Sequence, residues 1–357
     1  MRKAMLGSIR AWGAAILTLA GVAAAPPAAL HAQQAPPAPT PAANTVEAIR
    51  ARGTLVCGVN TGLAGFGAPD AQGRYRGFDV DFCRAVAAAM LGDPERVRFV
   101  GTTTQNRFTA LQSGEVDLLS RNTTWTFSRD TALGFDFPAV TFYDGQGFMV
   151  RADSGVSRGS EIGGATVCVQ PGTTTEQNLA DWARANRIQV QPVVIERLEE
   201  VTGAFFAGRC DVFTTDVSGL AATRAAQGAR AEQYRILPDV ISKEPLGPAV
   251  RQGDPRFADI VRWVHYAMVA AEEFGITSQN VEQAARTDPR PEVQRLLGRT
   301  GDLGQMLGLP NDWAVKVIRA VGNYGESFQR NLGPIGIQRG PNRLWTEGGL
   351  QYAPPFR

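Results

Sequence analysis

Two residue types that often carry chemistry are scarce in this sequence of 357 residues. Histidine occurs only as His31 and His265, and no two of the four cysteines have C-x-x-C spacing. A zinc centre usually needs clustered Cys and His ligands. The same scarcity leaves few candidates for a general base. We therefore expect no metal site and no cofactor.

Long apolar runs and basic tracts are also missing beyond the first 32 residues. No later segment has 18 uninterrupted apolar residues, so we expect a soluble mature chain. No basic run carries interleaved aromatic residues, and we expect no nucleic-acid partner.

The N-terminus has the order of regions that is typical of a secretory signal peptide. Arg2, Lys3 and Arg10 are basic, an apolar run covers residues 11–25, and small residues lead to a cleavage point after Ala32. The alternative is a membrane anchor, but a spanning helix needs roughly 20 apolar residues. No cysteine lies near the cleavage point, which argues against a lipid anchor. The sequence thus predicts export with cleavage of residues 1–32.

Residues 33–44 are rich in Pro, Ala and Gln, a composition that is typical of a flexible tether. Removing the three basic groups of the signal from the formal charge of +2 leaves the mature chain near −1. The basic character of the whole sequence therefore belongs to its export signal, and we expect the folded part of the chain to begin near Thr45.

An internal similarity suggests that the mature chain has two related halves. Thr54–Gly62 (TLVCGVNTG) resembles Ala165–Thr173 (ATVCVQPGT), and Leu111–Thr123 (LQSGEVDLLSRNT) resembles Phe205–Val217 (FFAGRCDVFTTDV). The second pair has a glycine that looks like a helix stop and an aspartate that opens a strand. The alternative is coincidence, since helix–turn–strand units are common.

Strands and helices alternate in each half. The periodicity predicts helices over residues 78–90, 106–114, 198–208 and 257–274, and strands over 96–101 and 188–195. This alternation predicts an α/β fold with mostly parallel sheets, whose ligands bind at the carboxyl ends of the strands.

Two β-rich segments, residues 141–153 and 240–254, look like crossings between lobes. We predict that residues 45–147 and 241–282 form lobe 1, that residues 148–240 form lobe 2, and that residues 283–357 form an extension that packs on lobe 1. A cleft with a two-strand hinge would then separate the lobes.

The four cysteines allow three pairings. Cys57 is predicted on the first strand of one half and Cys83 on its first helix, whereas Cys168 and Cys210 are both predicted on strands of the other half. An exported chain meets an oxidising compartment, so the sequence favours disulfides Cys57–Cys83 and Cys168–Cys210. Four free buried thiols are the alternative.

The stretch SRNTTWTFSRD, residues 120–130, combines hydroxyl groups with Arg121 and Arg129 and has no adjacent base. A guanidinium binds a carboxylate through two parallel hydrogen bonds, so this stretch is suited to an anion. Arg129 could instead form a surface salt bridge with a neighbouring aspartate, and Arg121 could be a solvated strand end.

Two further segments offer complementary groups. PGTTTE, residues 171–176, places threonines at a helix N-terminus, where free N–H groups favour an anion, although Thr173 and Glu176 could simply form a capping box. Asp216 offers the acceptor that an ammonium group needs, although it could be the N-cap of a helix that begins near Val217.

Several motifs together resemble the periplasmic solute-binding proteins of polar amino-acid ABC transporters. They include GFDVDFCRAVA, RNTTWTFSRDTALGFDF, QPGTTTEQNLAD and GRCDVFTTDVSGL. The segments ISKEPLGPAVRQGD and NDWAVKVIRAVGNYGESFQRNLG are similar to the general L-amino-acid-binding subgroup, so the likeness covers nearly the whole mature chain. The resemblance implies a two-lobed type II periplasmic binding fold that closes on its ligand.

The resemblance also implies roles for individual residues. Arg129 would hold the α-carboxylate of an L-amino acid, Thr173 or Thr174 would be a second donor to it, and Asp216 would bind the ammonium group. Thr124 and the region of Asn122 would complete the polar shell. The aromatic residue expected after the first strand is replaced by Leu63, with Phe66 three residues on, so Phe66 is a candidate for stacking on the ligand side chain.

The implied partners are an L-amino acid and an inner-membrane permease, and the implied location is the periplasm, with the protein as a monomer. One alternative is an enzyme of the same fold, for example a dehydratase that acts on a prephenate-like acid; Glu244 would be its best acid, since His265 lies on a core-like helix. Another is a binding module that senses an amino acid for a membrane partner. Such a sensor is normally fused to a membrane-spanning segment, and we expect none in the mature chain. We expect that the chain is not an enzyme.

Overall fold

The structure is a computed structural model that describes residues 44–357. The predicted signal peptide and residues 33–43 of the predicted tether lie outside this range. The first lobe is built on a three-stranded parallel sheet in the order β4–β1–β5. Its elements are α1 (Thr45–Arg52), β1 (Leu55–Asn60), β2 (Ala68–Pro69), β3 (Tyr75–Arg76), α2 (Phe78–Leu91), β4 (Val97–Thr102), α3 (Arg107–Ser113), β5 (Leu118–Leu119), α4 (Phe127–Thr131) and β6 (Phe135–Asp136).

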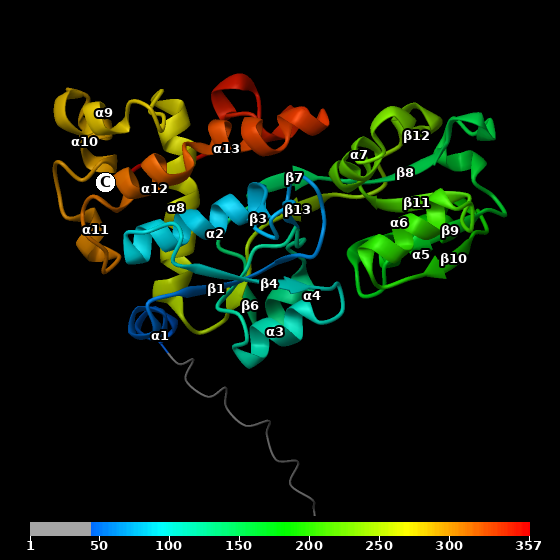
Figure 1. Cartoon of the computed structure of the whole chain (residues 1–357), viewed down its shortest axis with the longest axis horizontal. Helices are drawn as coiled ribbons and strands as arrows, with labels where there is room; N and C mark the ends of the chain where they lie inside the picture. The colour runs from blue at the N-terminus through cyan, green and yellow to red at the C-terminus, as the bar shows by residue number, and fades with distance from the viewer. Residues whose placement is uncertain (1–43) are drawn as a thin grey trace, which may run out of the picture. The chain divides into compact units, whose positions relative to one another are not determined.

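Helix α2 is the central helix of lobe 1, and glycines fix both of its ends. Gly77 precedes it with φ +137°, and a side chain there would collide with the carbonyl oxygen of Phe66. Gly92 ends the helix in a left-handed conformation. The helix is buried on nearly all sides because it contacts β1 and β4 as well as α8 (Pro255–Glu273) and α12 (Trp313–Val321) (Figure 1).

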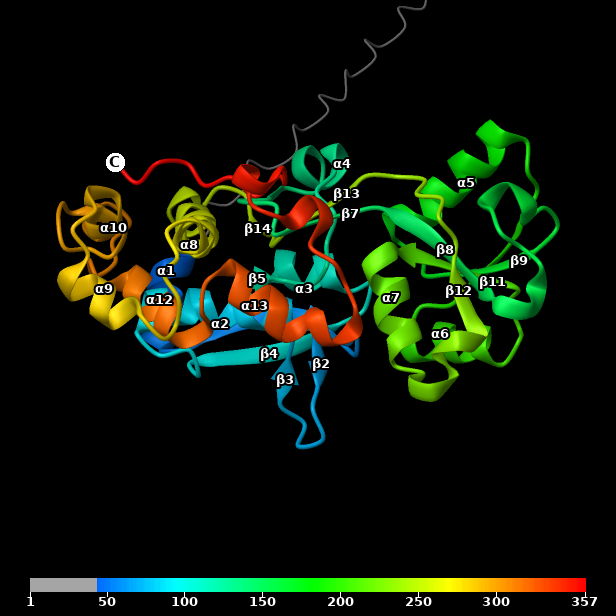
Figure 2. The same cartoon turned by 90° about the horizontal axis from the view of Figure 1, so that it is seen from above.

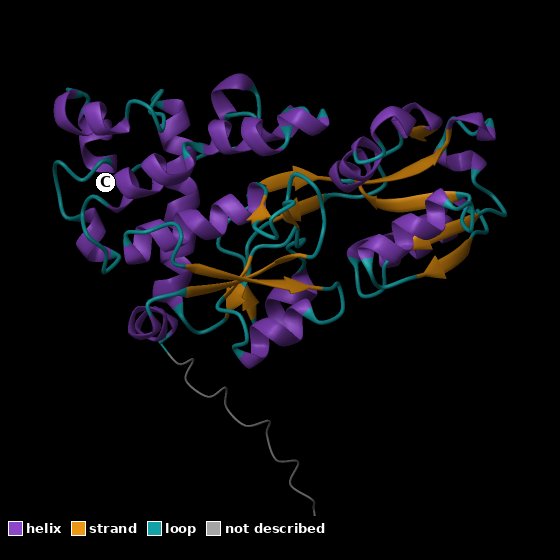
Figure 3. Ribbon diagram, in the orientation of Figure 1, coloured by secondary structure: helices purple, strands orange, loops and turns teal. Residues whose placement is uncertain are grey.

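The second lobe has a five-stranded sheet in the order β10–β9–β11–β8–β12. Only β8 runs against its neighbours, while β9 pairs with β10 and β11 in parallel. Helices flank this sheet, as the colouring of Figure 3 shows. The elements are β8 (Gln146–Arg151), β9 (Thr166–Val169), α5 (Thr174–Asn186), β10 (Gln191–Val194), α6 (Leu198–Phe206), β11 (Val212–Asp216), α7 (Val217–Ala225) and β12 (Tyr234–Ile236).

Two antiparallel strands connect the lobes. β7 (Phe142–Asp144) leads from lobe 1 into β8, and β13 (Glu244–Leu246) leads back towards β14 (Val250–Arg251), which pairs with β6. Asp144 and Glu244 are directly opposite each other in this pair. The two-lobed α/β architecture with a two-strand hinge confirms the fold class predicted from the sequence.

The C-terminal residues lie against lobe 1. Helices α12 and α13 (Tyr324–Asn331) contact α8, and α12 also contacts α2 (Figure 2). The Asp81 carboxylate accepts hydrogen bonds from Ser327 and Asn331, which ties α13 to α2. The predicted boundary at residue 283 falls inside α9 (Val281–Thr287), which is followed by α10 (Pro291–Leu296) and α11 (Leu303–Met306).

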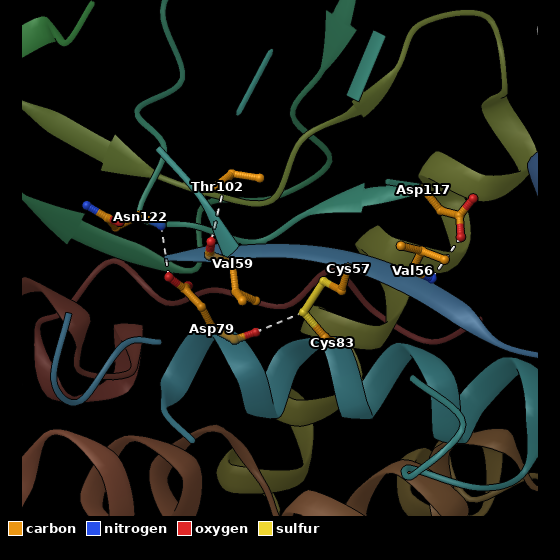
Figure 4. Close-up of a disulfide and its surroundings, with 8 residues drawn as sticks. All are labelled: Val56, Cys57, Val59, Asp79, Cys83, Thr102, Asp117 and Asn122. Atoms are coloured by element: carbon orange, nitrogen blue, oxygen red, sulfur yellow. Dashed lines mark hydrogen bonds between the residues drawn. A yellow bond between two sulfur atoms is a disulfide. The ribbon is translucent and has the colours of Figure 1, made fainter. Parts of the chain in front are cut away.

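Each lobe contains one disulfide. Cys57–Cys83 joins β1 to α2 (Figure 4), and Cys168–Cys210 joins β9 to the turn before β11. These are the pairs that the sequence favours. One detail differs from the prediction: Cys210 is not on a strand, because β11 begins at Val212.

Candidate functional site

A polar cavity lies where the carboxyl ends of strands from both lobes meet. It is lined by residues at or just after the carboxyl ends of β1, β4, β5, β9 and β11, together with the start of α3, α5 and α6 and part of α7. The lining residues are Asn60, Leu63, Thr104, Arg107, Arg121, Asn122, Thr124, Gln170, Thr173, Thr174, Thr175, Leu198, Thr215, Asp216, Gly219 and Thr223. Most of the residues predicted for the site are therefore brought together.

Lobe 1 contributes a cluster of three buried guanidinium groups. Arg107 and Arg121 line the cavity. Arg129 lies beside it, donates from Nη1 to the Thr124 carbonyl oxygen at 2.8 Å, and is 5.0 Å from the centroid of the Phe108 ring. Burial lowers the pKa of Arg121 and of Arg129 to about 10. The cluster is a costly concentration of positive charge, which an anionic ligand would relieve.

Arg107 is the charged residue of the cavity lining that is not among the site residues predicted from the sequence. It is 3% exposed, and its Nε has no hydrogen-bond partner among residues 44–357. Burial lowers its pKa well below the usual value, and the charges of Arg121 and Arg129 lower it further. The signal in the sequence was its position: Arg107 is the first residue of a helix that follows a parallel strand, where ligands of such sheets bind.

Lobe 2 contributes a buried carboxyl group, that of Asp216. The residue ends β11 at the N-cap position of α7, but its side chain makes no capping hydrogen bond. Burial raises its pKa well above the usual value, and the neighbouring charges of Asp144 and Glu244 raise it further. The side chain of Asn122 and the charge of Arg107 act in the opposite direction. An ammonium group in the cavity would favour the ionised form.

Thr173 and Thr174, at the start of α5, make different contacts. The Thr173 hydroxyl accepts from Glu176 N at 3.1 Å and donates to the Gln170 carbonyl oxygen at 2.7 Å, so it acts as the N-cap of α5. The reciprocal half of a capping box is missing, because Glu176 accepts from Gly172 N instead. Thr174 Oγ1 lies 3.3 Å from Thr124 Oγ1, and this contact joins the two lobes.

Asn122 has an unusual backbone, and Phe66 does not reach the cavity. Asn122 has φ +30°, and its N–H donates to the Asp79 carboxylate at 2.8 Å (Figure 4). Phe66 is 1% exposed, and its ring centroid is 5.4 Å from that of Phe142 in the lobe 1 core. The turn from Leu63 to Gly67 places Leu63 towards the cavity and Phe66 into the core. The prediction that Phe66 contacts a ligand is therefore not supported.

The two candidates for acid–base chemistry lie outside the cavity lining. His265 is buried, and its Nε2 is 3.0 Å from Gln351 Oε1; burial lowers its pKa to about 4. It borders a different hollow, between α8 and residues 350–352. Glu244 is buried in the hinge strand behind Thr124 and Thr174, and both hydroxyls donate to it.

Comparison with known proteins identifies the class. Residues 55–280 match the bacterial extracellular solute-binding proteins, family 3. The general L-amino acid-binding periplasmic protein AapJ of Rhizobium johnstonii is 57% identical over 88% of this chain and 93% of that protein. The glutamate/glutamine/aspartate/asparagine-binding protein BztA of Rhodobacter capsulatus is 58% identical over 88% of this chain and 94% of that protein.

A solved structure points to the same class of protein as the two relatives. The chain is similar to an ABC transporter periplasmic binding protein from Brucella ovis with glutathione bound, with a TM-score of 0.86 and 53% identity over 88% of this chain and all of that one. This chain therefore belongs to the family 3 bacterial extracellular solute-binding proteins. Among residues 44–357, no helix has the length and apolar character that crossing a membrane requires.

Proposed function

We propose that this protein captures L-amino acids in the cavity between its lobes and delivers them to the permease of an ABC transporter. The observation that carries the proposal is the separation of charge in one cavity. Guanidinium groups lie on the lobe 1 side and the Asp216 carboxyl group on the lobe 2 side. A zwitterion satisfies both sides at once, and only the closed arrangement of the lobes lets it do so. The names of the relatives AapJ and BztA support this ligand class.

Three guanidinium groups exceed what one α-carboxylate requires. In this proposal, Arg129 holds the α-carboxylate through two parallel hydrogen bonds. Arg107, with an unpartnered Nε, is then available for a carboxylate or carbonyl group of the ligand side chain. The site should therefore prefer acidic amino acids and their amides over apolar ones, as the name of BztA also suggests.

The cellular setting follows from the same reasoning. We propose that the signal peptide is cleaved after Ala32 and that the mature chain works in the periplasm as a monomer. Delivery to the permease would follow closure of the lobes, because the closed form differs from the open one in the surfaces that it presents.

Calorimetric titration with each of the twenty amino acids tests the proposal. We expect binding of acidic amino acids and amides, and a loss of about 100-fold or more in affinity for Arg129→Ala, because a buried charge partner is removed. Arg184→Ala is the matched control, since Arg184 is an exposed arginine of α5. Wild-type protein that binds none of the twenty, or an Arg129→Ala variant that binds as tightly as wild type, would contradict the proposal.

A further inference from the structure

The C-terminal extension contains a segment, residues 331–342, that runs from the end of α13 to the hinge, and we call this segment the strap. At its start, Asn331 Nδ2 donates to the Asp81 carboxylate on α2 at 2.7 Å. At its end, the Asn342 side chain accepts from Tyr143 N at 2.6 Å and donates to Tyr143 O at 3.0 Å. The strap is therefore held at one end by lobe 1 and at the other by the hinge strand β7.

The contact between Asn342 and β7 fixes the part of the hinge that belongs to lobe 1. Asn342 is 2% exposed, and its amide pairs with both backbone groups of Tyr143, in the way that a neighbouring strand would. Buried backbone groups rarely give up such partners. β7 should therefore move together with lobe 1, and bending between the lobes should fall on the residues that follow Tyr143.

The strap also packs on the turn that brings Leu63 to the cavity. Gly65 in this turn has φ +78°, and a side chain there would begin 2.5 Å from Ile335 Cδ1 and 3.1 Å from the Asn331 carbonyl oxygen. Leu332 is fully buried in the apolar cluster of lobe 1, and Ile335 packs against the same cluster. The strap is thus in close contact with the backbone behind one wall of the cavity.

Between its two anchors, the strap reaches lobe 2. Its 3-10 turn η4 (Gly333–Ile335) contacts α7, and the end of α13 lies beside α7 in both views (Figure 1 and Figure 2). Ala222 of α7 is 1% exposed and belongs to the apolar cluster of lobe 1 that includes Leu332. Gly219 and Thr223 of the same helix line the cavity. One helix of lobe 2 therefore forms part of the cavity wall and also touches the extension.

We propose that the strap stabilises the closed arrangement of the lobes through its contact with α7, so that the C-terminal extension takes part in holding the ligand. Val217 N donates to the Gly145 carbonyl oxygen at 2.8 Å, so α7 begins at the hinge, whereas Ala222 lies further along the helix. Parting of the lobes would carry Ala222 away from the strap and expose apolar surface to water. The inference rests on the proposed function, because that function requires closure.

The anchoring of the strap is what makes a small contact effective. A loose loop would lose conformational freedom each time the lobes closed, and this loss would offset the contact. The strap is already ordered on lobe 1 by Asn331, Leu332 and Asn342, so the approach of α7 costs little further entropy. A contact that is made only in the closed form shifts the equilibrium towards that form. The strap also lies outside residues 55–280, so it adds to the part of the chain that matches the family.

The experiment measures ligand release from Ile335→Ser and from a matched control, Leu307→Ser. Leu307 is also a partly buried apolar residue of the extension that packs on lobe 1, but it follows α11, at the end of lobe 1 away from lobe 2 (Figure 1). Calorimetry gives the dissociation constant and stopped-flow mixing gives both rate constants, with the amino acid that the wild type binds most tightly. We expect Ile335→Ser to raise the dissociation constant and the dissociation rate constant by about 5-fold or more. The association rate constant should change little.

A second variant approaches the same contact from lobe 2. Ala222→Asn places a polar side chain where α7 meets lobe 1, and it should also speed release. If the two substitutions act through one contact, the double variant should lose less affinity than the two single losses combined. Additive losses would mean that Ile335 and Ala222 act independently, and the inference would be wrong. If Ile335→Ser does not fold, Ala222→Asn decides by the same release measurement.

Thermal unfolding separates this role from a purely structural one. Ile335→Ser and Leu307→Ser should both unfold at lower temperature, since each removes a partly buried apolar side chain. Release as slow as in wild type from Ile335→Ser, or equally fast release from Leu307→Ser, would overturn the inference. If the wild type binds no amino acid, the proposed function fails and the inference fails with it. If it binds amino acids but the variants release them alike, only the inference fails.

Discussion

The strands β5 and β11 lead to different groups at the cavity on the same local scaffold: Arg121 and the neutral Asn122 follow β5, whereas the acidic Asp216 ends β11. Each strand follows a helix and a left-handed glycine, which is the C-cap Gly114 in lobe 1 and Gly208, one residue after the C-cap, in lobe 2, and each strand is preceded by an aspartate. Five residues after that aspartate, the chain reaches Asn122 in lobe 1 and Asp216 in lobe 2, and both line the cavity. The repeated unit places polar side chains at the cavity edge, and the residues at its end decide their charge.

The aspartates that precede β5 and β11 make the same contact in different surroundings. Asp117 accepts from Val56 N on β1 at 2.8 Å (Figure 4), and Asp211 accepts from Thr166 N on β9 at 2.8 Å. Asp117 is 4% exposed, whereas Asp211 is exposed to solvent. In both lobes, an aspartate side chain thus links the start of one strand to the neighbouring strand, β1 or β9. Its burial sets how much this hydrogen bond contributes to the stability of the fold.

The largest effect on ligand affinity is expected when the carboxyl group of Asp216 is removed from lobe 2. Asp216→Asn should weaken amino-acid binding by about 100-fold or more, because a desolvated ammonium group loses its charged partner. Calorimetry with the amino acid that the wild type binds most tightly measures the loss. Asp181→Asn is the control, since Asp181 is an exposed acid of the same lobe. Unchanged affinity in Asp216→Asn would mean that lobe 2 does not hold the cationic end of the ligand.

The sequence predicts the scaffold better than the cavity, and particular residues show why. Hydrophobic period, glycine stops and the repeat locate α2, α3, α6 and β11 within a few residues, because these signals are local. Phe66 shows the limit: whether it faces the cavity or the core depends on a turn from Leu63 to Gly67. Arg107 shows the same limit, since its burial near Arg121 and Arg129 requires the start of α3 and residues 120–130 to meet in the fold.

Hydrogen-bond direction is even less accessible from the sequence. Glu244 is some seventy residues from Thr174 and more than a hundred from Thr124 in the sequence. Nothing in the three segments indicates that both hydroxyls donate to the Glu244 side chain. The resemblance assigns residues to a site but does not fix which of them donate. That property depends on the group behind each hydroxyl.

A smaller effect separates the two supporting aspartates. Asp117→Ala should lower the free energy of unfolding by about 2–3 kcal/mol, because it leaves the buried Val56 N–H without its side-chain acceptor and also removes the partner of Arg52. Asp211→Ala should cost about 1 kcal/mol, since water can replace its hydrogen bonds. Urea denaturation of each variant beside wild type measures the difference. Equal costs would show that burial does not distinguish the two halves.

The smallest expected effect is a pH dependence of opposite sign in the two halves. Burial raises the pKa of Asp117, so the folded state binds more protons there and its contribution to stability is lost as pH rises through the folded pKa. Hydrogen bonds from the Thr166 hydroxyl and amide lower the pKa of Asp211, so its contribution exists above the unfolded pKa and is lost as pH falls.

Unfolding measurements between pH 3 and pH 7 should therefore diverge for the two asparagine variants. Relative to wild type, Asp117→Asn should gain stability as pH rises, and Asp211→Asn should lose it. The Asp211 slope should be the shallower one, because solvent screens an exposed group. Slopes of the same sign would mean that the aspartates share one environment, and the halves would then differ only in the residues that end their strands. Opposite signs would place the difference in the scaffold itself, in how deeply each lobe buries the carboxylate that fixes its strand.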